Sequence, residues 1–196
     1  MAAAVRCVCL LSFPRVAEAI SEMNDSMHQS RFWAFSLAVY GDTAVQRECL
    51  DLQDRYDVDV NLLLLCAFIG SVHGAVLPAR DLRQAADLVS EWHTKIVTNL
   101  REARRALKPF ATDASSIAAA AGAVRRNVKA MELEAERVEQ TMLEDWTASR
   151  LDAWPRIRAA EAVAVNIRAL FALGAGSAGE PRLPHRLIAA AVAAGH

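Results

Sequence analysis

The sequence predicts an all-α protein, a compact single-domain bundle of six or seven helices that includes a long antiparallel helical hairpin. Three observations support this fold class. The chain has 196 residues with only six Pro and eight Gly, a composition that favours helix. Apolar residues recur near the helical period along most of it, and no alternating strand pattern extends beyond about four residues. With 54% hydrophobic residues, the chain can bury one core without disulfides.

The first expected helix covers residues 31–40. It is apolar on nearly all sides, so we expect it to be buried. Gly41 ends this helix. Asp42 or Thr43 can then cap a second helix that runs to about Tyr56.

A third helix is expected over residues 60–72, with Asp59 as its N-cap. Residues 60–69 are apolar except for Asn61, so we expect this helix to lie at the centre of the core. The apolar stretch is about half the length that a bilayer requires. We therefore expect no membrane span.

The next segment predicts the hairpin. Residues 78–107 carry an apolar stripe at helical spacing over about thirty residues. Residues 108–113 interrupt it, and Thr112 or Asp113 can cap another long helix that runs to about Asp145. Two long helices with a short connection fold back on each other as an antiparallel pair.

The remaining segments complete the expected organisation. Pro155 suits the first turn of a further helix that ends the helical domain, residues 31–173. Residues 174–184 are rich in Gly and Pro and predict a linker, and residues 185–196 predict a short C-terminal helix. Residues 1–30 imitate a secretory signal only weakly, so we interpret them as a loosely ordered N-terminal extension.

Net charge and cysteine content limit the partners and the compartment. The formal net charge is −1, which gives no overall bias toward nucleic acid or an anionic membrane. The four cysteines, Cys7, Cys9, Cys49 and Cys66, do not form a disulfide framework. Buried or idle thiols in a reducing compartment are the simplest interpretation, so we expect a cytoplasmic protein.

Motifs for known chemistry are absent from the sequence. It contains no phosphate-binding loop, dinucleotide fingerprint, Glu-x-x-His pair or G-x-S-x-G elbow. Asp57, Asp59 and Asn61 have the spacing that begins a calcium loop, but Leu62 and Phe68 occupy the positions of its glycine and final glutamate. We therefore expect no metal and no cofactor.

His93 has the richest titratable neighbourhood in the chain, with Glu91 and Lys95 close in sequence. Because Glu91 and His93 point to different helix faces, we interpret His93 as a surface or capped histidine. A catalytic or sensing role is the alternative.

Basic residues gather on both arms of the expected hairpin. They are Arg101, Arg104, Arg105 and Lys108 on one arm and Arg125, Arg126 and Lys129 on the other. If the arms pair so that Arg101 lies level with Ala121, both groups share one end of the hairpin. This basic end could bind phosphate or carboxylate oxygens, or it could be solvated surface. In either case, changing the four basic residues of the first arm to Gln should hardly affect stability.

Five sequence blocks stand out together between about residues 31 and 145: FWAFSLAVYG, CLDLQD, DVNLLLLCAFIG, WHTKIVTNLREARRALK and VKAMELEAE. As a set they resemble a family of small proteobacterial proteins of unknown function. The resemblance implies a soluble, bacterial, mostly helical domain. It implies no activity, cofactor or catalytic residue.

Two functional hypotheses follow from the sequence. The preferred one is a non-catalytic binding or adaptor module that recognises a protein partner or an anionic ligand. Its surface is Arg101, Arg104, Arg105, Lys108, Arg125 and Arg126. The alternative is an enzyme or small-molecule-binding protein with a core pocket near Trp33, Tyr40, Asn61 and Trp92. Nucleic-acid binding is less favoured, because few aromatic residues lie beside the arginines.

Overall fold

The computed structural model describes residues 30–112, 116–174 and 181–195. All regular segments within these ranges are helical, apart from one isolated bridge between Ala75 and Arg156. The all-α prediction is therefore confirmed. The expected N-terminal extension, except Ser30, and most of the expected linker lie outside the described residues.

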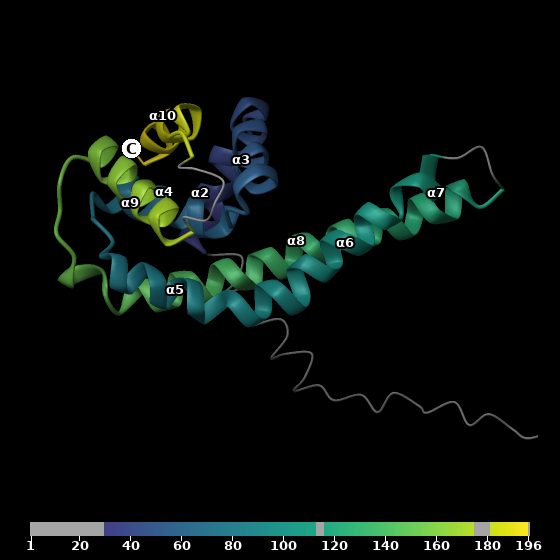
Figure 1. Cartoon of the computed structure of the whole chain (residues 1–196), viewed down its shortest axis with the longest axis horizontal. Coiled ribbons are helices and arrows are strands. Elements are labelled where there is room, and N and C mark those ends of the chain that lie inside the picture. The colour runs from purple at the N-terminus through teal and green to yellow at the C-terminus, as the bar shows by residue number, and fades with distance from the viewer. Residues whose placement is uncertain (1–29, 113–115, 175–180, 196) are drawn as a thin grey trace, which may run out of the picture.

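The helices fall into a bundle and a hairpin (Figure 1). The bundle helices are α2 (Arg31–Tyr40), α3 (Thr43–Tyr56), α4 (Val60–His73), α9 (Ala159–Leu173) and α10 (His185–Ala194). The first arm of the hairpin is α5 (Ala79–Trp92), the π-helical turn η1 (His93–Val97), α6 (Thr98–Ala106) and α7 (Lys108–Thr112). The second arm is α8 (Ala118–Ala148), followed by the short 3₁₀ turn η2 (Leu151–Ala153).

Side-chain caps fix where α3 and α4 begin. The Asp42 carboxylate accepts a hydrogen bond from the backbone N–H of Ala44, and Asp59 accepts one from that of Asn61. Each bond satisfies a backbone donor that has no partner within the helix. Both predicted caps are confirmed. Asp57 ends α3 in the left-handed conformation, with φ of 55°.

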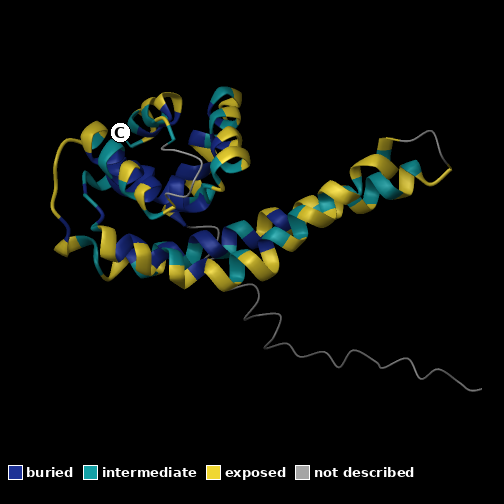
Figure 2. Cartoon of the chain, in the orientation of Figure 1, coloured by how far each residue is buried: buried dark blue, intermediate teal, exposed yellow. Residues whose placement is uncertain are grey.

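Helix α4 is the centre of the core, as predicted. Every residue from 61 to 71 is buried, and α4 packs closely along α9 (Figure 2). Gly70 makes this close approach possible. A Cβ at that position would lie 2.5 Å from the backbone nitrogen of Val163, so no larger residue fits without moving α9.

The prediction that residues 31–40 are buried on nearly all sides is wrong. Phe32, Phe35 and Val39 are buried, but Leu37 is 54% exposed and Trp33 is only half-buried. Helix α2 packs against α4, α8 and α10, while the face that carries Leu37 borders an open cleft.

The antiparallel hairpin is present, and its distal half projects from the bundle (Figure 1). Its connection differs from the prediction. Helix α7 continues the first arm to Thr112, and α8 begins at Ala118 after Ile117. The Thr112 hydroxyl donates back to the carbonyl of Lys108 and does not cap α8. Asp113 lies outside the described residues.

Pro155 does not start a helix, in contrast to the prediction. It lies in an extended segment before α9, where its carbonyl accepts a hydrogen bond from Val76 at 2.8 Å. The fully buried Asn166 secures the facing loop, because it accepts from Leu77 and donates to the carbonyl of Ala75. These bonds hold the α4–α5 connection against α9.

Two further expectations concern the cysteines and the membrane. Cys49 and Cys66 are buried free thiols, while Cys7 and Cys9 lie outside the described residues. In the described part of the chain, no helix combines the length and the apolar character that crossing a bilayer requires.

Candidate functional site

A cleft of about 350 Å³ lies where α2, α3 and α4 face the hairpin helices α6 and α8. We call it the hairpin cleft. Its walls are mainly apolar and include Leu37, Leu50, Val60, Leu64, Leu133 and the rings of Trp33 and Tyr40. A cleft of this volume with apolar walls is typical of small-molecule sites.

Two buried polar atoms in the cleft walls have no hydrogen-bond partner among the described residues. They are Oγ of Ser36, which is 3% exposed, and Oε1 of Gln140, which is 2% exposed. An unpaired buried polar atom costs about 1–3 kcal/mol, and such atoms are rare in folded proteins. Both residues line the cleft, so a small rotation of either side chain would bring its oxygen within reach of a bound molecule.

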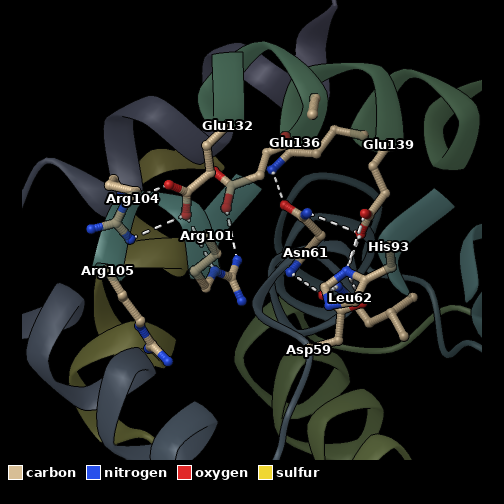
Figure 3. Close-up of polar contacts among 12 residues, drawn as sticks. Asp59, Asn61, Leu62, His93, Arg101, Arg104, Arg105, Glu132, Glu136 and Glu139 are labelled. Carbon is tan, nitrogen blue, oxygen red and sulfur yellow. Dashed lines mark hydrogen bonds and ion pairs between the residues drawn. The ribbon is translucent and has the colours of Figure 1, made fainter. Parts of the chain in front are cut away.

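Arg101 and Arg104 of α6 point toward acidic residues of α8 (Figure 3). Arg101 donates to Glu132 at 3.3 Å and to Glu136 at 2.9 Å, and Arg104 donates to both oxygens of Glu132. The predicted register is therefore wrong, because Arg101 lies level with these glutamates and not with Ala121. The reason is α7, which lengthens the first arm and moves the connection farther along the chain.

The other predicted cations lie apart from these ion pairs. The Arg105 side chain is 58% exposed, lies 3.5 Å from Asp54, and borders the cleft together with the exposed Lys129. Lys108, Arg125 and Arg126 do not line the cleft. Their role as a binding surface stays a prediction.

Three of the four residues predicted for a core pocket, Trp33, Tyr40 and Asn61, line the cleft. Trp92 does not. Its indole N–H donates to the carbonyl of Ala135 at 3.0 Å and fastens α5 to α8. The cleft thus brings together most of the predicted pocket and half of the predicted basic surface.

Beside the cleft, three ionisable residues from separate helices form a cluster (Figure 3). Nδ1 of His93 lies 3.1 Å from Oε2 of Glu139 and 3.3 Å from Oδ2 of Asp59. Asp59 is the N-cap of α4, His93 begins the π-helical turn η1, and Glu139 lies on α8. The interpretation of His93 as a surface or capped histidine is wrong, because its side chain is 22% exposed and paired with both carboxylates.

The environment of the cluster shifts the pKa values of Asp59 and His93. Burial and the nearby Glu139 carboxylate raise the pKa of Asp59 to about 6, although His93 opposes the shift. The hydrogen bond to Glu139 raises the pKa of His93. In the cleft, burial likewise raises the pKa of Tyr40 to about 12, which keeps its hydroxyl neutral.

Sequence reasoning missed the cluster and the two unpaired atoms. Asp59, His93 and Glu139 are far apart in the chain, and no sequence motif connects them. The local signals were the spacing of Asp57, Asp59 and Asn61 and the titratable neighbourhood of His93. Its real partners lie on α8 and at the start of α4, and not on its own helix.

The fold and the site define an all-α protein with an open cleft between a helical bundle and a projecting hairpin. Residues 31–143, more than half of the chain, match the family described as a protein of unknown function (DUF2390), and the chain belongs to this family. The resemblance to an uncharacterised family is therefore confirmed. The matched region contains the residues of both the hairpin cleft and the cluster. Comparisons with curated proteins and with solved structures gave no match.

Proposed function

We propose that this protein binds a small amphiphilic anion in the hairpin cleft. The observation that carries the proposal is the pair of buried, unpaired atoms, Ser36 Oγ and Gln140 Oε1, in the walls of an otherwise mainly apolar cleft. A bound molecule that supplies their missing hydrogen bonds removes the cost of burying them. The apolar walls supply the remaining affinity.

The side chains of the cleft walls indicate which chemical groups the ligand carries. An amide oxygen only accepts hydrogen bonds, so Gln140 calls for an O–H or N–H donor on the ligand. Leu37, Leu50 and Leu64 call for an apolar body. Arg101 and Arg104 already pair with glutamates, so an anionic group is best placed near the mouth, beside Arg105 and Lys129.

This proposal combines the two sequence-based hypotheses. The anionic ligand comes from the basic-surface hypothesis, and the cleft comes from the pocket hypothesis. The proposal involves binding alone and no reaction. A protein partner on the distal basic residues Lys108, Arg125 and Arg126 stays a separate prediction.

Blocking the cleft should weaken the binding of an amphiphilic anion. The probe is 1-anilinonaphthalene-8-sulfonate, followed by fluorescence, with octanoate as competitor. Ser36→Phe fills the buried wall, and Leu37→Glu places a negative charge at the mouth without disturbing the core, since Leu37 is exposed. We expect each variant to weaken binding at least about tenfold, which corresponds to about 1.4 kcal/mol.

The matched control is Leu88→Glu, which adds the same charge at an exposed leucine of α5 that does not line the cleft. It should bind the dye and octanoate as the wild type does. Unchanged affinity in Leu37→Glu, or failure of octanoate to displace the dye from the wild type, would contradict the proposal.

The charge at the mouth gives a separate prediction. Changing Arg105 and Lys129 to Gln should weaken octanoate binding about fivefold, because an exposed charge pair contributes about 1 kcal/mol or less, and should reduce its dependence on salt. The control changes the exposed Arg47 and Arg83, which do not line the cleft, to Gln. Equal affinity and equal salt dependence in both double variants would place the anionic group elsewhere.

A further inference from the structure

We propose that Asp59, His93 and Glu139 bind a divalent transition-metal ion. This inference is independent of the cleft ligand and goes against the expectation from sequence that the chain has no metal site. It rests on the geometry, the charge and the outer hydrogen bonds of the cluster.

The geometry already suits an ion. One ligand atom from each residue lies within 4.8 Å of the others, and His93 Nδ1 is 3.1 Å and 3.3 Å from the two carboxylates. An ion bonded to nitrogen and oxygen at about 2.1 Å brings its donors to roughly 3–3.5 Å from one another. Small movements of the side chains are therefore enough to form the site.

The charge of the cluster calls for a cation. Two carboxylates share one imidazole, and Glu139 is completely buried. Within the described ranges, the ion pairs of Asp59 and Glu139 involve only His93. Buried charge without full compensation is costly. A divalent ion between the three side chains would neutralise the negative charge of the two carboxylates.

Outer hydrogen bonds orient the carboxylates as they do around metal ions. Backbone N–H groups of Asn61 and Leu62 donate to Oδ1 of Asp59, so Oδ2 is directed toward His93. The Asn61 amide donates to Glu139 at 2.9 Å, and Gln140 holds that amide by donating to its oxygen at 2.9 Å. Such partners fix metal-binding side chains in place.

The backbone at His93 is also unusual. The π-helical turn η1 begins at His93 and interrupts the long first arm of the hairpin. Single π-helical turns occur frequently at functional sites because they redirect a side chain that a regular helix would place elsewhere. Here the turn accompanies a histidine that faces α8 and the start of α4.

The donor set indicates the class of metal. One imidazole nitrogen with two carboxylates suits Zn²⁺, Mn²⁺ or Fe²⁺ better than Ca²⁺ or Mg²⁺, which prefer oxygen ligands throughout. Three protein donors leave at least one coordination position open. Asp59 and Asn61 also line the hairpin cleft, so the ion would lie beside the proposed ligand.

Calorimetric titration of the full chain tests the site. Protein treated with EDTA is titrated with Mn²⁺ and with Zn²⁺, the latter in a Cys7→Ser/Cys9→Ser background, because those thiols could themselves bind Zn²⁺. We expect one saturable site per chain. His93→Ala should weaken it at least about a hundredfold, more than the 10- to 100-fold loss typical of an outer-shell residue. His185→Ala, an exposed histidine on α10, is the control and should leave it unchanged.

Asp59→Asn keeps the proposal testable if His93→Ala fails to fold. Asn caps helices as well as Asp does, so this variant retains the start of α4 but removes one anionic ligand. It should weaken Mn²⁺ binding at least about tenfold while far-ultraviolet circular dichroism stays unchanged. Absence of a saturable site in the wild type, or equal metal affinity in the wild type and in a folded Asp59→Asn or His93→Ala variant, would overturn the proposal.

Discussion

Replacing Gly70 with valine is expected to prevent this protein from folding. The Cβ of any larger residue would lie 2.5 Å from the backbone nitrogen and 2.7 Å from the Cα of Val163. These are main-chain atoms of α9, so relief requires moving a whole helix that packs along the centre of the core. Even Gly70→Ala should cost more than about 4 kcal/mol, at the upper end of the range for single substitutions. Urea denaturation followed by circular dichroism measures the loss.

The matched control is Gly122→Ala on α8. A Cβ there meets only the end of the flexible Arg126 side chain, at 3.6 Å. Alanine is a better helix former than glycine by about 0.5–1 kcal/mol, so this variant should be as stable as the wild type or slightly more stable. A cooperative transition near that of the wild type in Gly70→Ala would show that α4 and α9 do not pack as the structure describes.

Much of the bundle could be predicted because its signals are local. The cap at Asp59 and the apolar run after it predict where α4 begins and that it is buried. The cap at Asp42 likewise predicts where α3 begins. Helix α2 shows the limit of this reasoning. Because it carries apolar residues on nearly all sides, its sequence pattern does not indicate which side packs against a neighbour. Its Leu37 face borders the cleft, and only the positions of α4 and α6 determine that.

The predicted register of the hairpin was wrong for a related reason. The sequence predicts that residues 108–113, which include Pro109, interrupt the first arm after Leu107. Proline is, however, well accommodated in the first turn of a new helix, here α7. A few residues of added length shift every pairing between the arms. The cluster at His93 was harder still. Its partners Asp59 and Glu139 come from other helices, and only the correct register brings them together.

The corrected register separates the basic residues of the first arm into two pairs, and their removal should affect stability to very different extents. Arg101 and Arg104 are mostly buried against Glu132, whose side chain is 8% exposed. Breaking a buried ion pair by removing one partner leaves the other charge without compensation, at a cost of about 3–5 kcal/mol. Arg105 and Lys108 are exposed, and an exposed charge contributes about 0–1 kcal/mol to the free energy of unfolding.

Arg101→Gln/Arg104→Gln should therefore destabilise the protein by about 3 kcal/mol or more, whereas Arg105→Gln/Lys108→Gln should stay within about 1 kcal/mol of the wild type. Gln forms helices nearly as well as Arg, so intrinsic helix propensity does not explain the difference. Hydrogen exchange should locate the loss in α6 and the facing part of α8, because these helices are joined there by the ion pairs and the distal hairpin has little other support. Adding Glu132→Gln to the first double variant should recover part of the stability by removing the stranded carboxylate. Equal stability of the two double variants would mean that Arg101 and Arg104 are solvated surface, as the uncorrected register implied.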